Sequence, residues 1–368
     1  MMKFTTKRDQ LLKGLQFVTG VVERRQSLPI LSHVLIRVQN SRLSLVGSDL
    51  EIELTGHADL IENESPFETT VSGRKLMDIC RTLPESADIS FHLDGTKAFL
   101  VAGKSRFSLV TLPSTDFPLA AFESSGNEVT CLQAELAALL ESTSFAMAQQ
   151  DVRYYLNGLF FEADNNTICS VATDGHRLAV RKMEFHGLAT PTQFILPRKG
   201  VIELLRLLSK EEGKTLSMRI GQNAIRLESD TFTFVSRLIE GKFPDYRRVI
   251  PQGGNKKAIV DRDTLKQALT RAAILTNEKY HAVRLHFDTN SLLITATNTE
   301  QEEAKDEIPL QYEGDALEMG FNVNYLLDVL SAVPPGEVIF TLSSPDNSVL
   351  IHSDGLGQAQ FVIMPMSL

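Results

Sequence analysis

Cysteine is scarce in this sequence: Cys80, Cys131 and Cys169 are the only three among 368 residues. Their number is odd and they lie far apart, so they lack the paired spacing of a disulfide framework or a zinc site. Reduced and mostly buried thiols fit this pattern better, and such thiols are typical of a cytosolic protein. We therefore expect a cytoplasmic location.

Long apolar runs are missing as well. No run approaches the ~18–20 apolar residues that a helix needs to span a bilayer. The first residues, Met1 to Lys7, lack the apolar stretch that a signal peptide requires. The sequence therefore predicts neither a membrane span nor a secretion signal.

The sequence also has no overall excess of positive charge, because its formal net charge is −9. Proteins that bind nucleic acid usually contain a clearly basic domain. The net charge alone therefore argues against nucleic-acid binding, and only the distribution of charge along the chain can reverse that argument.

Signatures of catalysis are incomplete. Gly103-Lys104-Ser105 resembles the end of a phosphate-binding loop, but Ala98 stands where the first glycine belongs, and a strand pattern follows instead of a helix. Asp174-Gly175-His176-Arg177 has no accompanying serine or cysteine elbow. The eight histidines show no metal-ligand spacing. We expect no enzymatic activity, no cofactor and no metal.

What the sequence does contain is an internal repeat with a period of about 120 residues, too long for a solenoid. Apolar residues at spacings of three and four predict an amphipathic helix at the start of each third, over residues 7–20, 133–148 and 262–275. Alternating apolar residues predict a hairpin after each helix. A second helix and a second hairpin then follow, with the helices over residues 73–82, 197–210 and 323–333.

The corners after the first hairpins also match: Gly47-Ser48-Asp49, Ala172-Thr173-Asp174 and Ala296-Thr297-Asn298. Three unrelated α+β domains would be the simpler alternative, but matched element order and matched corners make it much weaker. Polar, glycine-bearing junctions place the boundaries near residues 125 and 253. We predict three domains, over residues 1–125, 126–252 and 253–368.

Positive charge is concentrated on the predicted helices. Four of the six carry more Lys and Arg than Asp and Glu, and the rest of the chain is more acidic than the whole. Any single helix is explained equally well as an ordinary solvated face. Together, however, the helices would form a surface that attracts phosphate while the remaining surface repels it. Without an aromatic stacking platform, such a surface suits backbone contact and no base readout.

Two segments are typical of edge strands with opposite charge. Residues 103–109 are basic and residues 300–307 are acidic. Pairing the first domain of one chain with the third domain of another would be a head-to-tail contact, and two chains would give six units in a ring. The alternative, that both segments are charged only to prevent aggregation, is equally consistent with these residues.

Several long motifs resemble one family, the β sliding clamps of bacterial DNA polymerase III, in a form similar to the proteobacterial members. The resemblance covers the whole chain, and the motifs that carry it are 150–158, 172–179, 197–204, 243–249, 320–325 and 364–368. The resemblance implies a non-catalytic processivity factor of DNA replication. It implies a homodimeric ring of α+β clamp domains, with helices lining the hole and antiparallel sheets outside.

The resemblance also implies a hydrophobic peptide pocket between the second and third domains. There, short peptides of the polymerase III α subunit, the clamp loader, other polymerases and repair proteins would compete. The residues carried over to this pocket are Leu156, Thr173, Gly175, His176, Arg177, Leu178, Pro244, Arg248, Val249, Asn322, Tyr325, Ser348, Val362, Met364, Pro365 and Met366. Ser367, Asp346 and Tyr280 depart from the family pattern, so partner affinity is expected to differ from that of relatives.

Two further residue sets follow for the ring. The dimer contact is expected to involve Lys75, Lys104, Arg106, Phe107, Leu109, Ile274, Leu275, Glu300, Glu302, Glu303 and Asp306. Sequence-independent DNA contacts are expected from Lys13, Arg25, Arg74, Lys75, Arg81, Gln150, Arg153, Tyr154, Tyr155, Arg198, Lys199, Arg206, Lys266 and Arg271. Tyr154 and Tyr155 are equally well explained as core residues.

Two other functional classes remain as alternatives. One is an interaction scaffold whose positive helices bind another polyanion or nothing. The other is a small-molecule enzyme that uses the loop containing Asp174, His176 and Arg177.

Overall fold

The computed structural model describes residues 2–22, 28–39, 42–63, 65–122, 127–164, 166–185, 187 and 190–367. The chain forms two compact units, one from residues 1–134 and 202–238 and the other from residues 135–201 and 239–368. Each unit is described separately. Residues 124–126 of the expected first junction, 124–127, lie outside the described part, and the boundaries near residues 125 and 253 stay a prediction.

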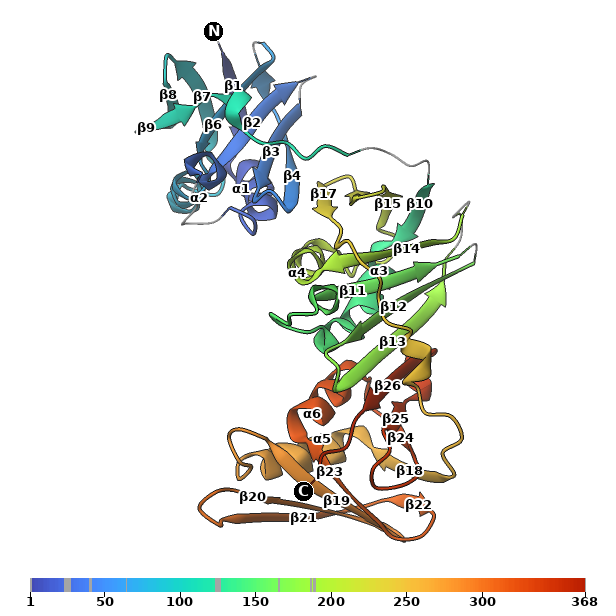
Figure 1. Ribbon diagram of the computed structural model, residues 1–368. Helices are drawn as coiled ribbons and strands as arrows, with labels where there is room; N and C mark the ends of the chain where they lie inside the picture. Colours follow the sequence, from blue (N-terminus) through green and yellow to red (C-terminus); the bar gives the residue numbers. More distant parts are fainter. Residues whose placement is uncertain are drawn as a thin grey trace. The chain divides into compact units, whose positions relative to one another are not determined.

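The predicted repeat is confirmed by the order of elements, which recurs three times along the chain (Figure 1). Each copy begins with a strand and a helix. Three consecutive strands follow, then a further strand that leads into the second helix, and three more strands end the copy. The first copy comprises β1 (Lys3–Lys7), α1 (Arg8–Val18), β2 (His33–Gln39), β3 (Arg42–Ser48), β4 (Ile52–Asp59), β5 (Glu62–Asn63), β6 (Phe67–Ser72), α2 (Gly73–Thr82), β7 (Asp88–Asp94), β8 (Lys97–Ala102) and β9 (Ser105–Leu112).

The second and third copies repeat this order, except that among the described residues the second lacks the short strand that is β5 in the first copy and β22 in the third. The second comprises β10 (Asn127–Leu132), α3 (Gln133–Glu141), β11 (Gly158–Ala163), β12 (Thr167–Thr173), β13 (Arg177–Glu184), β14 (Thr192–Pro197), α4 (Arg198–Leu207), β15 (Thr215–Ile220), β16 (Ala224–Glu228) and β17 (Phe232–Arg237). The third comprises β18 (Lys256–Asp261), α5 (Arg262–Ala273), β19 (Ala282–Asp288), β20 (Ser291–Thr297), β21 (Glu303–Pro309), β22 (Gln311–Glu313), β23 (Leu317–Asn322), α6 (Val323–Ala332), β24 (Glu337–Leu342), β25 (Val349–His352) and β26 (Ala359–Ile363).

Short 3-10 helices fill several connections. They are η1 (Pro29–Ser32), η2 (Ser114–Asp116), η3 (Ser144–Ala146), η4 (Tyr154–Leu156), η5 (Tyr246–Arg248) and η6 (Asp354–Leu356). The first helix of the second copy is shorter than predicted, because α3 ends at Glu141 rather than near residue 148. Just after α3, the hydroxyls of Ser142 and Thr143 donate to the Leu139 carbonyl, and such side-chain bonds compete with helix continuation.

Antiparallel pairing assembles three sheets, as the α+β prediction requires. The first unit holds a 13-stranded sheet in the order β10-β15-β16-β17-β4-β3-β2-β6-β9-β8-β7-β1-β5. The second unit holds a nine-stranded sheet, β14-β11-β12-β13-β26-β25-β24-β18-β22, and a four-stranded sheet, β21-β20-β19-β23. In the first copy α1 packs beside α2, and in the third α5 packs beside α6 (Figure 1).

The helices pack on the sheets through the apolar stripe that their sequence predicts. On α5, Leu265, Ala268, Leu269 and Ala272 are buried, at the spacing of one helix face. The helix begins after Asp261, whose carboxylate accepts the Thr264 N–H at 2.8 Å as an N-cap. Local capping and a single buried stripe therefore account for the position of this helix.

Consecutive copies are joined edge to edge within a sheet. In the first unit β4 pairs with β17, the last strand of the second copy. In the second unit β13 pairs with β26, the last strand of the third copy. Each joint thus connects the third hairpin strand of one copy to the last strand of the next copy.

The cysteines and the described helices bear on two of the sequence predictions. All three cysteines are buried, and no disulfide joins them. Burial raises the pKa of the Cys80 thiol to about 12, so it stays protonated near neutral pH. Among the described helices, none is both long and apolar enough to cross a membrane.

The joint between β4 and β17 contains a half-buried carboxylate and predicts a pH dependence. Glu53 accepts the Ala120 N–H at 2.6 Å, and burial raises the pKa of its carboxyl group. The charged form therefore costs stability at neutral pH, and this cost disappears below the ordinary pKa of 4.5. We expect Glu53→Gln to raise the midpoint of thermal unfolding at neutral pH and to have no such effect below that pKa.

The exposed neighbour Glu51 provides a matched control, and Glu51→Gln should leave the midpoint unchanged at both pH values. A gain for Glu53→Gln that is as large in acid as at neutral pH would contradict the burial argument.

Candidate functional site

The end of the chain is fastened to two different parts of the second unit. The Met364 N–H donates to the His176 carbonyl at 2.9 Å, beside β13. The Met366 N–H donates to the Gly320 carbonyl at 2.8 Å, in β23. The tail therefore bridges the second and third copies, as expected for a segment that forms part of a binding surface.

An apolar floor lies beside the tail. Leu178 of β13 is the register partner of Val362 of β26, and both belong to one buried cluster with Leu156. Two apolar side chains of the predicted pocket are more open, Val249 at 37% and Met364 at 39% exposure. A buried floor with partly exposed apolar side chains suits an apolar peptide side chain.

Arg177 connects the β12–β13 loop to helix α6. Its guanidinium bonds Asp174 at 3.1 Å and Asp328 at 2.5 Å, and it donates to the Phe145 carbonyl at 2.7 Å. The same group lies over the ring of Tyr325, 4.5 Å from its centroid. Because only 11% of the side chain is exposed, Arg177 is a fixed part of the structure rather than a mobile surface charge.

The β12–β13 loop has a fixed shape that depends on short-range bonds. The Gly175 N–H donates to the Thr173 hydroxyl at 3.1 Å, and Gly175 has a φ of +91°, a region that favours glycine. A Cβ atom at Gly175 would lie 3.0 Å from the guanidinium of Arg153. The Asp174 carboxylate accepts hydrogen bonds from the backbone N–H groups of His176 and Arg177 and thereby stabilises the turn.

The other predicted pocket residues lie on neighbouring segments of the same unit. Asn322 caps α6 by accepting the Asn324 N–H at 2.9 Å, and Ser348 directly precedes β25. Pro244, Arg248 and Pro365 lie in the η5 segment and the tail. Of the departures from the family pattern, Tyr280 accepts the Asn322 amide at 3.4 Å, while Asp346 and Ser367 are exposed.

The sequence prediction missed the residues that hold this surface in place. Phe243 stacks on Phe160 with ring centroids 4.7 Å apart, and this stacking anchors the segment that leads into η5. Asp328 and Phe145 hold Arg177 from elements distant in sequence. The apolar Phe243 before a proline was the one local signal that could have indicated an anchor.

Nothing in these contacts assembles a catalytic or metal centre. Within the described ranges, no group of three or more His, Cys, Asp or Glu side chains is placed to hold a metal ion. The carboxylate and guanidinium of the Asp174–Arg177 loop bond each other and their neighbours.

Three family models match consecutive parts of the chain. They describe the N-terminal, central and C-terminal domains of the DNA polymerase III beta subunit, at residues 2–121, 130–245 and 247–367. The chain belongs to the DNA polymerase III beta subunit family. Its members are the beta sliding clamps, and the protein is a processivity clamp of DNA replication with no catalytic role.

Individual relatives agree with the family over full length. A beta sliding clamp of Pseudomonas putida is 50% identical over 375 residues, and that of Escherichia coli is 47% identical over 367 residues, each with complete coverage of both chains. The crystal structure of the Pseudomonas aeruginosa subunit superimposes with a TM-score of 0.97 at 48% identity, again with complete coverage. A second Pseudomonas aeruginosa clamp structure, bound to griselimycin, gives a TM-score of 0.96 at 48% identity.

The two predicted edge strands occupy different positions in their sheets. β21 is the terminal strand of the four-stranded sheet, as predicted. β9 pairs with β8 along most of its length, but with β6 only at Thr111 and Leu112. Among the described strands, the segment 105–110 of β9 therefore has a neighbour on one side only.

The residues expected at the dimer contact differ in accessibility. Lys104, Arg106, Glu300, Glu302 and Glu303 are exposed, and Ile274 is 77% exposed. Leu109 is buried within its own unit, whereas the adjacent Val110, which the sequence prediction omitted, is 66% exposed. Asp306 bonds Arg271 of its own chain at 2.6 Å. Lys75 is exposed, while Phe107 and Leu275 are half-buried.

The residues expected to contact DNA differ in exposure and in their contacts within the chain. Lys13, Arg74, Lys75, Arg81 and Gln150 are exposed, and Tyr154 is 57% exposed. Others are engaged within the chain: Arg206 donates to the carbonyls of Gln16 and Phe17 at the end of α1, Arg153 bonds Asp151, and Arg198 reaches the Met147 carbonyl. Tyr155 packs against the buried cluster, and Lys199 and Lys266 are half-buried. Arg25 lies outside the described residues.

The two joints between copies differ at one equivalent position. Leu178 pairs with Thr173 and Val362, and its counterpart Glu53 pairs with Ser48 and Val235. The joint in the first unit therefore has a carboxylate where the joint in the second unit has an apolar floor.

The role of Arg177 can be tested by Arg177→Lys. A lysine keeps the charge but cannot bond Asp174, Asp328 and the Phe145 carbonyl at the same time. We therefore expect the free energy of unfolding to fall by about 1–3 kcal/mol. The amide proton of Met364 should also exchange faster, because its acceptor lies beside Arg177. Arg284→Lys is the control, since Arg284 and Glu318 are both 52% exposed. Equal effects of the two substitutions would contradict the assigned role.

Proposed function

We propose that the chain forms a head-to-tail homodimer that closes into a ring around duplex DNA. The repeated joint between copies carries this proposal. β4 joins β17 and β13 joins β26, but β21, the equivalent strand of the third copy, ends its sheet. The open segment of β9, the last strand of the first copy, is its natural partner on a second chain.

Charge complementarity supports the same pairing. The open segment of β9 begins next to Lys104 and includes Arg106, both exposed. The approach to β21 carries Glu300, Glu302 and Glu303, all exposed. Opposite charges favour this pairing and disfavour β9 with β9 or β21 with β21. Exposed apolar groups, Val110 and Ile274, can pack beside the strands.

The proposed DNA contact is electrostatic and independent of sequence. Exposed basic side chains of α1 and α2, among them Lys13, Arg74 and Lys75, can attract phosphate. Weak contacts are sufficient if the ring encloses the duplex, and they allow sliding along it. The buried, unlinked cysteines are consistent with a cytoplasmic location.

We further propose that partner proteins bind through short peptides at the surface around Leu178, Val362 and the tail. The polymerase III α subunit, the clamp loader, other polymerases and repair proteins would share this site. The apolar floor, the fixed Arg177 and the docked tail support this assignment. Met364 adds an adaptable side chain, which suits a site with several partners.

The dimer is tested by light scattering, which should give a mass near twice 40.9 kDa. Arg106→Glu places a negative charge opposite the acidic strand and should shift the protein toward monomer. Lys97→Glu, an equal change of charge on exposed β8, should leave the dimer intact. A monomeric wild type at micromolar concentration would refute the ring.

The peptide site is tested by deleting residues 364–368. Without Met364 and Met366 the tail loses both backbone anchors, so binding of a polymerase III α-subunit peptide should fall below detection while the dimer persists. Ser367→Ala is the control, because it keeps both anchors. Unchanged peptide affinity after the deletion would remove the assignment.

A further inference from the structure

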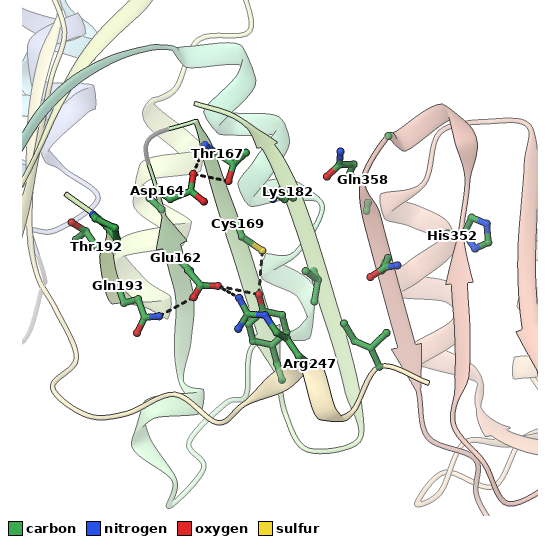
Figure 2. Close-up of a pocket in the computed structure, with 18 of the residues that line it drawn as sticks. Glu162, Asp164, Thr167, Cys169, Lys182, Thr192, Gln193, Arg247, His352 and Gln358 are labelled. Atoms are coloured by element: carbon green, nitrogen blue, oxygen red, sulfur yellow. Dashed lines mark hydrogen bonds and ion pairs between the residues drawn. The ribbon is translucent and has the colours of Figure 1, made fainter. Parts of the chain in front are cut away.

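A second cavity, of about 940 Å³, lies on the same face of the nine-stranded sheet as the proposed peptide site. It extends over β14, β11, β12, β13, β26 and β25 and is bounded by η5 (Figure 2). We call this cavity the η5 groove. None of the residues expected at the peptide site lines it.

The floors of the two sites are continuous. Leu178 and Val362 are register partners in the peptide site, and Val180 and Gln360, two residues along the same strands, are register partners in the η5 groove. Residues two apart on a strand share a face and lie roughly 7 Å apart. One peptide can therefore contact both floors.

The wall between the sites is a single 3-10 turn. Tyr246 and Arg247 of η5 line the groove, whereas Arg248 and the following Val249 belong to the expected peptide site. The Tyr246 hydroxyl donates to Glu162 at 3.3 Å, and Arg247 bonds the same carboxylate (Figure 2). The wall is thus fixed before any ligand binds.

Four charged side chains line the groove, and they differ in how far they are engaged by neighbouring groups. Glu162 is engaged by Arg247 and by the Gln193 amide at 2.9 Å. Asp164 accepts the N–H groups of Asn166 and Thr167 in its own turn. Lys182 is exposed, and in the described part of the chain no carboxylate lies within ion-pair distance of it. The lining thus holds two carboxylates, Glu162 and Asp164, and two cations, Lys182 and Arg247. The backbone N–H groups of Asn166 and Thr167, and after them the charge of Lys182, lower the pKa of Asp164. Lys182 is the one of the four whose charged group makes no hydrogen bond or ion pair within the described residues.

The remaining polar groups suit an extended peptide. Gln358 and Gln360 line the groove on the side of β26, and Gln193 lies on the opposite side (Figure 2). Amide side chains both donate and accept hydrogen bonds, as a peptide backbone requires. Val180, Ile250 and Leu350 supply apolar surface between them.

We propose that the η5 groove binds the segment that flanks the clamp-binding motif of a partner protein, with an acidic residue of that segment paired to Lys182. Continuity with the peptide site and the exposed Lys182 ammonium, which has no ion pair within the described residues, carry this inference, which rests on the proposed peptide-binding function. The groove thus distinguishes partners that share a motif by the charge of their flanks.

The test uses fluorescent peptides from the polymerase III α subunit. One peptide contains the motif alone, and the others add a short extension, at either end, that contains glutamates, glutamines or lysines. With the wild-type dimer, one glutamate extension should bind about two- to fivefold more tightly than its glutamine counterpart, as an exposed ion pair allows. In Lys182→Glu this preference should disappear, and the lysine extension should become the tighter one.

Two controls separate the outcomes. Lys214→Glu changes the net charge equally on the other compact unit and should retain the preference for glutamate. The unextended peptide should bind wild type and Lys182→Glu equally. Suppose that the unextended peptide binds both wild type and Lys182→Glu. If neither extension then shows a charge preference, or if the preference survives in Lys182→Glu, the groove proposal is overturned while the peptide site stands. If the unextended peptide does not bind wild type, the peptide site fails and the groove proposal fails with it.

Discussion

Pairing of strand edges between successive copies is the constraint on which the rest of the structure depends. An unpaired edge presents backbone donors and acceptors that must find a partner or water. Two such edges are paired inside the chain, by β4 with β17 and by β13 with β26. Of the strands equivalent to those in the two joints, β21 of the third copy and the segment 105–110 of β9 in the first copy have no such partner among the described residues, so two chains can pair them by closing on each other.

The joint between β13 and β26 also creates the surface on which partners are proposed to bind. It brings the β12–β13 loop beside the chain's last residues, and the Met364 N–H then fastens the tail to His176. Arg177 ties this loop to α6 through Asp328. The equivalent joint in the first unit places Glu53 at the floor, so one fold gives two joints with different chemistry.

Much of this architecture could be predicted from the sequence because its signals are local. The spacing of Leu265, Ala268 and Leu269 predicts α5, and matched corners reveal the repeat. Local sequence patterns do not predict structure correctly where contacts with residues distant in sequence determine it. Ser142 and Thr143 follow the end of α3, although the apolar spacing predicts that the helix continues past them. The Thr143 hydroxyl also forms a hydrogen bond with Ser170 on β12.

The candidate site was predictable only in part, for the same reason. Leu178 and Val362 came from a family resemblance, while the partners of Arg177 come from segments far apart in the chain. Whether Leu109 or Val110 points outward from β9 depends on how β9 pairs with β8. The register of that pairing cannot be deduced from the sequence of one strand alone. The η5 groove has no sequence motif at all.

The central claim is that the closed ring, rather than phosphate affinity, holds the protein on DNA. The most direct measurement loads the dimer onto a nicked circular duplex with its loader, and then cuts the circle once at moderate salt. A ring that encloses the duplex stays on the intact circle and leaves the linear duplex from its ends. Retention on the linear duplex under the same conditions would contradict this claim.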